Sequence, residues 1–168
     1  MPETNTVGKL KRSAHLFYID TTFGGSTPSW YLVGKDVEDM SIELNPDVES
    51  KKNILDETTV NDNGYEPSIS VDTYYANPSD GDFYTKIKNI AMNRLTGDAC
   101  RTKVLEVLVD KATGPFDAWQ EYAVIKPQSY GGPQGGISIP YNVHFDGERV
   151  QGTATIANKI PTFTPPQS

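Results

Sequence analysis

The sequence is poor in the residue types that most often carry chemistry. It contains one cysteine, Cys100, and two histidines, His15 and His144, among 168 residues. A single cysteine excludes an internal disulfide, and its ordinary role is that of a small buried hydrophobe. A serine nucleophile would need a histidine and an acid beside it, and no nucleophile elbow or calcium-binding loop pattern is present. We therefore expect no catalytic site, no cofactor and no metal ion.

Basic side chains and long apolar runs are also scarce. Fifteen basic residues stand against 22 acidic ones, which gives a formal net charge of −7. Nucleic-acid affinity rests on Lys and Arg displacing counterions, so the composition argues against a phosphate-gripping surface. No stretch approaches the roughly 20 apolar residues of a membrane span, and the first residues lack the apolar run of a signal peptide. The sequence predicts a soluble protein made in the cytoplasm, with no membrane partner.

What the chain does contain is β-strand patterning and one helical pattern. Strands are predicted for HLFYID, WYLV, KVLEVLVD and AWQEYAVIK, and a closing hairpin for ISIPYNVHFDGERVQGTATI, with its tight turn at Asp146-Gly147. Phe83, Ile87 and Ile90 recur at helical spacing, which predicts a helix over 80–96 with Gly97 as its stop. The predicted fold class is mainly β (α+β), a β-sandwich or barrel flanked by one α-helix.

The chain divides into three parts around one domain, because 168 residues would make two marginal cores if split. Residues 1–13 are polar and read as a flexible N-terminal arm with a small basic cluster. Residues 14–157 form the domain, and the proline-rich residues 158–168 read as an extended C-terminal tail. Residues 45–67 are charged and long, which predicts an unusually long loop of the kind that is functional or disordered.

The segment 37–75 is the most informative one. Met40, Ile42 and Leu44 alternate with Asp39, Ser41 and Glu43, and Ile69, Val71 and Thr73 alternate with Ser68, Ser70 and Asp72. Alternate side chains on a strand point to opposite faces, so each strand is expected to bury one face and expose a polar, acidic one. Open strand edges need a partner, and a symmetric ring that pairs the edges of neighbouring subunits supplies one. The pattern therefore favours self-assembly.

With these elements the chain resembles the major tail tube protein of long-tailed (siphovirus-type) bacteriophages and of related injection tubes. The likeness rests on the arm, on DVEDMSIELNPDVESKKNILDE and YEPSISVDTYY with the loop between them, on the helix DFYTKIKNIAMNRL, and on the closing hairpin. It covers nearly the full length as a pattern of elements. In that family a β-sandwich flanked by a helix forms hexameric rings, which share an inner β-barrel and stack into a tube without enzymatic activity.

The resemblance implies a structural virion protein of the tail, whose negatively lined tube conducts the genome into the host cell. The implied partners are further copies in a homo-hexamer, a tape measure protein in the lumen, tail terminator and distal tail proteins, and DNA in non-specific passage. The implied lumen-facing residues are Asp39, Ser41, Glu43, Ser68, Ser70 and Asp72. The implied ring-to-ring contacts are Lys51, Lys52, Ile54, Leu55, Asp56 and Glu57 of the loop, with Lys11 and Arg12 of the arm.

A second hypothesis is a β-sandwich carbohydrate-binding module. Exposed aromatic rings stack on sugars, and the candidates for such a platform are Tyr74, Tyr75, Trp119 and Tyr130. The alternative role of these rings is packing in the core or between subunits. The carbohydrate-binding hypothesis predicts binding to a glycan array that Trp119→Ala abolishes.

Overall fold

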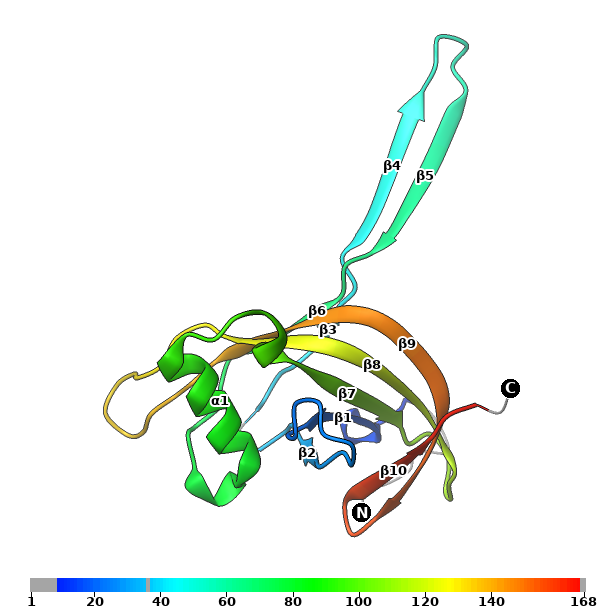
Figure 1. Cartoon of the computed structure of the whole chain (residues 1–168). Helices are drawn as coiled ribbons and strands as arrows, with labels where there is room; N and C mark the ends of the chain where they lie inside the picture. The colour runs from blue at the N-terminus through cyan, green and yellow to red at the C-terminus, as the bar shows by residue number, and fades with distance from the viewer. Residues whose placement is uncertain (1–8, 36, 167–168) are drawn as a thin grey trace.

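The chain folds around one strongly curved antiparallel sheet of eight strands, from which a separate two-stranded hairpin projects (Figure 1). The computed structural model describes residues 9–35 and 37–166. The strands are β1 (His15–Asp20), β2 (Trp30–Leu32), β3 (Ile42–Glu43), β4 (Pro46–Lys52), β5 (Thr58–Tyr65), β6 (Ser68–Val71), β7 (Arg101–Leu108), β8 (Phe116–Pro127), β9 (Tyr141–Ala157) and β10 (Ile160–Thr164). The helix is α1 (Asp82–Asn93), and short 3₁₀ helices cover Arg12–Ala14, Pro78–Asp80 and Gly97–Cys100.

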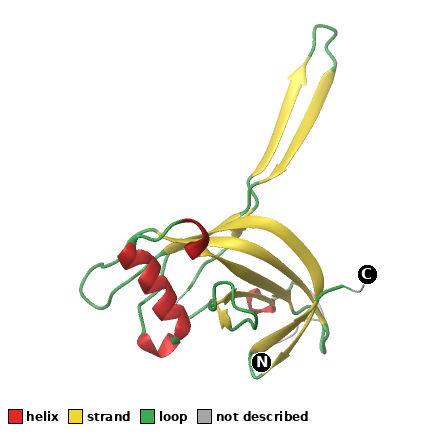
Figure 2. Ribbon diagram, viewed as in Figure 1, coloured by secondary structure: helices red, strands yellow, loops and turns green. Residues whose placement is uncertain are grey.

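The strand order is β2-β1-β7-β8-β9-β6-β3, with β10 paired to the far half of β9. Both faces of the curved sheet carry apolar clusters. The face under α1 holds the larger cluster, which includes Phe17, Ile69 and Ile125. On the opposite face, Tyr18 and its neighbours are covered by side chains from β2 and β10. The sheet therefore curls over itself at one end and is closed by the helix at the other (Figure 2).

Helix α1 is held to the sheet by its apolar stripe. Phe83, Ile87 and Ile90 are buried, and Phe83 stacks on Tyr31 with ring centroids 4.0 Å apart. The Tyr74 hydroxyl donates a hydrogen bond to Asp80 at 3.0 Å, which fixes the turn that leads into the helix. The expected mainly-β fold with one α-helix is thus confirmed.

Four segments of the chain differ from the sequence predictions. Residues 45–67 are not a loop: β4 and β5 pair from Pro46↔Tyr65 to Lys52↔Thr58. The helix predicted over 80–96 is shorter, because Arg94 adopts a left-handed conformation (φ 53°) and the Leu95 amide bonds back to Ile90. Gly97 instead opens the next 3₁₀ helix.

The other two differences lie at the end of the chain. Residues 141–157 form one continuous strand, because Gly147 and Glu148, both with positive φ, make a bulge against β8 instead of a turn. The tail 158–168 is not merely extended: Asn158 and Lys159, also at positive φ, reverse the chain so that β10 pairs with β9. Of the predicted arm, residues 1–8 lie outside the described residues, and Arg12 already belongs to a 3₁₀ helix.

Candidate assembly surfaces

The β4–β5 hairpin is the most unusual surface of the molecule. Its two strands pair with each other in a sheet of their own and with no other described strand. Every residue of β4 is exposed, and so is every residue of β5 except the half-buried Gly64. Figure 1 shows the hairpin pointing away from the body of the domain. An isolated two-stranded hairpin is marginally stable in water, so this one needs either internal bracing or a partner.

Part of that bracing is a hydrogen-bonded tip organised by Asn53. Its side-chain oxygen accepts hydrogen bonds from the Leu55 amide (2.8 Å) and the Glu57 amide (3.0 Å), and its amide group donates to the Glu57 carboxylate at 2.7 Å. Lys52 adds an ion pair with Asp56 at 3.5 Å. Sequence reasoning missed Asn53, although an Asn between two strands is a known turn signal.

The bracing leaves apolar side chains uncovered. Ile54 is 99% exposed and Leu55 70% exposed at the tip. Along the strands, Val48 and Val60 are exposed too, and the pairing of Ser50 with Val60 puts both valines on one face of the hairpin. Four exposed aliphatic side chains on one projecting element are typical of a surface that another molecule covers.

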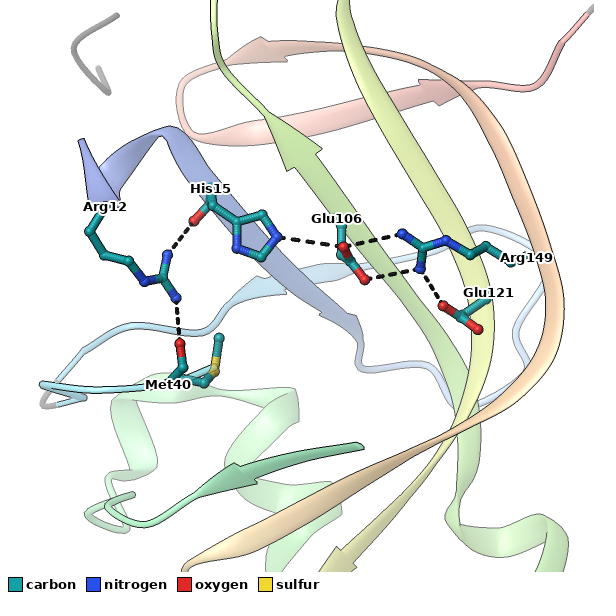
Figure 3. Close-up of polar contacts among 6 residues, drawn as sticks. All are labelled: Arg12, His15, Met40, Glu106, Glu121 and Arg149. Atoms are coloured by element: carbon teal, nitrogen blue, oxygen red, sulfur yellow. Dashed lines mark hydrogen bonds and ion pairs between the residues drawn. The ribbon is translucent and has the colours of Figure 1, made fainter. Parts of the chain in front are cut away.

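The predicted ring-to-ring residues divide between two places. Lys51, Lys52, Ile54, Leu55, Asp56 and Glu57 all lie at or beside the hairpin tip. Arg12, by contrast, is bound within its own chain: its guanidinium donates to the carbonyl oxygens of His15 (2.9 Å) and Met40 (3.0 Å), as Figure 3 shows. Arg12 thus ties the end of the arm to the segment before β3, and Lys11 precedes it in the chain.

Of the six predicted lumen residues, Glu43, Ser68 and Ser70 lie on one face of the sheet, and Asp39, Ser41 and Asp72 lie in the segments that flank β3 and β6. Met40, Ile69 and Val71 are buried beneath that face. Ser68 is half-buried. The other five residues are exposed, namely Asp39, Ser41, Glu43, Ser70 and Asp72. The alternation read from the sequence agrees with the burial of the three apolar residues, whereas Leu44, expected on the buried side, is 54% exposed. Their orientation toward a lumen stays a prediction.

A buried ion network lies on the other face, at the middle of the sheet (Figure 3). Arg149 of β9 bridges Glu106 of β7, at 3.1 Å, and Glu121 of β8. His15 of β1 approaches Glu106 with its Nε2 at 3.5 Å. Both carboxylates are buried, with 7% and 6% of their surface exposed, whereas the Arg149 side chain is 42% exposed. The partners come from four strands, so this network could not be read from any sequence motif.

The two carboxyl groups respond differently to this environment. Burial raises the pKa of Glu106, but hydrogen bonds from His15 and Arg149 outweigh it and hold the pKa below its ordinary value. Burial raises the pKa of Glu121 above its ordinary value, because Arg149 offsets the desolvation only in part. At neutral pH the network stabilises the sheet only as long as the guanidinium stays in place.

The network forms the floor of an open groove at the base of the hairpin. The groove has a volume of about 590 Å³, and its walls are mostly apolar. The lining residues are Ile42, Leu44, Tyr65, Pro67, Glu106, Glu121, Phe145 and Arg149. Two carboxylates on neighbouring strands suggest acid–base chemistry. Arg149 binds both of them, however, so their role in this structure is that of partners in a structural ion network.

The aromatic residues proposed as a sugar platform do not form one. Tyr74 is buried and hydrogen-bonded to Asp80. Trp119 is half-buried on β8, with the Arg149 guanidinium 5.6 Å from its ring centroid. Tyr75 and Tyr130 are about half exposed. With one ring in the core and another beside the ion network, the structure does not support the carbohydrate-binding hypothesis.

No group of three or more His, Cys, Asp or Glu side chains is placed to hold a metal ion among the described residues. No helix within residues 9–35 and 37–166 is long and apolar enough to cross a membrane.

The fold is similar to that of two solved structures. The chain is similar to a sheath/tube terminator of an extracellular contractile injection system in its extended state, with a TM-score of 0.51, 8% identity, and coverage of 88% of this chain and 99% of the other. It is also similar to the tube-terminating cap of the anti-feeding prophage, with a TM-score of 0.51, 14% identity, and coverage of 90% and 96%. The chain therefore has the fold of tube-terminating components of injection systems.

No family model matches the sequence, and no curated protein matches it either. At 8% and 14% identity, the likeness is one of fold alone. The comparisons therefore support the expected fold and do not single out the tail tube proteins of siphovirus-type phages.

Proposed function

We propose that this protein is a structural component of a phage-type tail tube or a related injection tube, and that it works as a hexameric ring. The observation that carries the proposal is the projecting β4–β5 hairpin, whose apolar residues have no cover within the described chain. The shared fold with two tube-terminating proteins supports it. The protein would then reside in the virion tail and contact the tape measure, terminator and distal tail proteins.

In this proposal the hairpin is the contact between stacked rings. Its tip carries Ile54 and Leu55, and Val48 and Val60 continue the apolar surface toward the body. Burying an aliphatic side chain contributes about 1.5–3 kcal/mol. Four such side chains repeated six times around a ring would hold two rings together without any enzymatic step.

The exposed face with Asp39, Glu43 and Asp72 would line the lumen. Carboxylates and hydroxyls on that wall would repel or ignore the phosphates of a passing genome, which lets DNA move without stalling. Ser70 donates a hydrogen bond to Asn142 on this face at 3.0 Å, so the wall is polar and internally bonded.

A second candidate within the same class is a terminating ring, which caps a tube once and does not repeat along it. The two structural similarities to terminators favour it. The candidates differ in what the purified protein does alone: a tube subunit is expected to stack into particles of many rings, and a terminator to stop at single or paired rings.

Negative-stain electron microscopy of the purified protein tests the proposal and separates the two candidates. A matched variant replaces residues 51–59 with Asn-Gly, which joins the paired residues Ser50 and Val60 through a two-residue turn. We expect this variant to keep its fold and form rings that no longer stack. A protein that stays monomeric at high concentration, also with tail components added, would overturn the proposed function, and normal stacking of the variant would overturn the role of the hairpin.

A further inference from the structure

The exposed polar face carries a charge pattern that follows the strand order. Pairing connects Arg101 of β7 to Val124 of β8, Val124 to His144 of β9, His144 to Ser68 of β6, and Ser68 to Glu43 of β3. Directly opposed residues in antiparallel strands share a face. These five residues therefore form one row across five strands, on the face that holds the predicted lumen residues.

The β7–β8 end of this row is cationic. Lys103 pairs across the strands with Tyr122, and its ammonium nitrogen lies 5.7 Å from the centroid of the Tyr122 ring. The Arg101 guanidinium stacks on the same ring at 4.1 Å and forms an ion pair with Asp146 at 2.8 Å. Lys103 has no carboxylate partner among the described residues. Lys103 is half-buried, and its ammonium group lies against the Tyr122 ring.

The β3 end is acidic and is also the edge of the sheet. Glu43 and Asp72 are exposed, and neither forms an ion pair with any described residue. Strand β3 pairs with β6 on one side only, so its outer side presents unpaired backbone groups. Soluble proteins cover such edges, because an open edge invites pairing with another chain. The two ends of the row thus carry opposite charge, and one of them, β3, is an open edge of the sheet.

We propose that these two ends are complementary halves of the lateral contact between neighbouring copies of this chain, with Glu43 of one copy opposite Lys103 of the next. The occupant is a second copy because the acidic and cationic ends lie on the same face of the same sheet. A contact between different patches of identical subunits is head-to-tail, and it closes into a ring when the rotation permits. The inference rests on the proposed ring and adds the residues that set the side-by-side contact.

Charge reversal with rescue tests this contact. Glu43→Lys and Lys103→Glu each replace an attraction by a repulsion, and we expect each to raise the concentration for half-assembly on the order of tenfold at about 50 mM salt. The double variant restores the opposite charges in exchanged positions and is expected to assemble within about threefold of the wild type. Lys88→Glu, an exposed reversal on α1, is the matched control. Sedimentation velocity measures all four, and circular dichroism verifies their folds.

The outcomes separate the inference from the function on which it rests. If the wild type assembles and both single reversals assemble equally well at low salt, or if the double variant is no better than the single ones, the lateral contact is wrong while the ring proposal stands. If the wild type forms no rings, both the ring proposal and the lateral contact are overturned.

A crosslink provides a readout that does not depend on affinity. Cys100 is fully buried, so the pair Glu43→Cys and Lys103→Cys in a Cys100→Ala background leaves only the two new thiols. Oxidation of assembled protein is expected to give a ladder of linked chains on a denaturing gel that ends at the ring size. Absence of the ladder in rings seen by microscopy would overturn the proposal.

Discussion

Replacing Arg149 with methionine tests the physical account of the buried ion network. Methionine keeps an unbranched apolar stem near Trp119 but removes the guanidinium that bridges Glu106 and Glu121. Breaking a fully buried ion pair by removing one partner costs about 3–5 kcal/mol. The Arg149 side chain is 42% exposed, so solvent screening reduces that cost, and we expect a loss of about 2 kcal/mol in the free energy of unfolding. For a chain of this length, such a loss lowers Tm by about 4–8 °C.

The loss should depend on pH in a defined direction. Without Arg149, burial raises the pKa of Glu121 further above its value in the unfolded chain, and the pKa of Glu106 rises from its lowered value. A carboxyl group with a raised pKa in the folded state destabilises the fold at high pH, and the penalty disappears as the pH falls through that pKa. The difference from the wild type is therefore largest near pH 8 and smaller near pH 5. In the wild type, the lowered pKa of Glu106 works the other way and contributes stability that is lost only at more acidic pH.

Urea unfolding followed by circular dichroism, at one low protein concentration and at both pH values, measures these differences. Arg101→Met is the control, because its ion pair with Asp146 is exposed and such pairs contribute about 0–1 kcal/mol. Adding Glu121→Gln to the Arg149 variant removes one of the orphaned charges and should recover part of the loss. A loss below about 0.5 kcal/mol, or one that is equal at pH 5 and pH 8, would refute the reasoning.

Two further predictions concern packing. Gly152→Ala places a Cβ 2.3 Å from the Thr164 carbonyl oxygen and 2.9 Å from the Phe163 ring, so β10 must shift and stability should fall by about 1–3 kcal/mol, with faster proteolysis of the C-terminal strand. Gly34→Ala meets nothing within 4 Å and serves as the control; equal behaviour of the two would contradict the packing of β10. Ile125→Ala in the core should lower the free energy of unfolding by about 2–5 kcal/mol, as measured by thermal unfolding. Ile54→Ala at the hairpin tip should leave Tm unchanged and weaken ring stacking instead; a large drop in Tm there would show that the tip packs within its own chain.

The charge distribution on the exposed face bears on how a tube could conduct DNA. The sequence alone predicts an acidic wall, because the acidic positions lie close together in the chain. The structure adds Arg101 and Lys103 of β7 to the same face. If those cations are paired with the acidic edge of the next copy, as we propose, the wall has few free cations, which suits passage without binding.

Several features were determined by the sequence itself because they depend on local periodicity. The alternation around Ile69 and Val71 fixes which side of β6 is buried, since side chains on a strand have a period of two. The spacing of Phe83, Ile87 and Ile90 fixes the helix and its buried side for the same kind of reason.

The tertiary structure decided what depends on distant partners. Only pairing with β8 keeps β9 continuous through Gly147, where the sequence reads as a turn. Only the strand order brings Arg149 to Glu106 and Glu121, and places Lys103 and Glu43 on one face with β8, β9 and β6 between them. The hairpin at 45–67 was also not predicted from the sequence. Its strands are exposed on both faces and therefore lack the apolar alternation by which a half-buried strand is recognised.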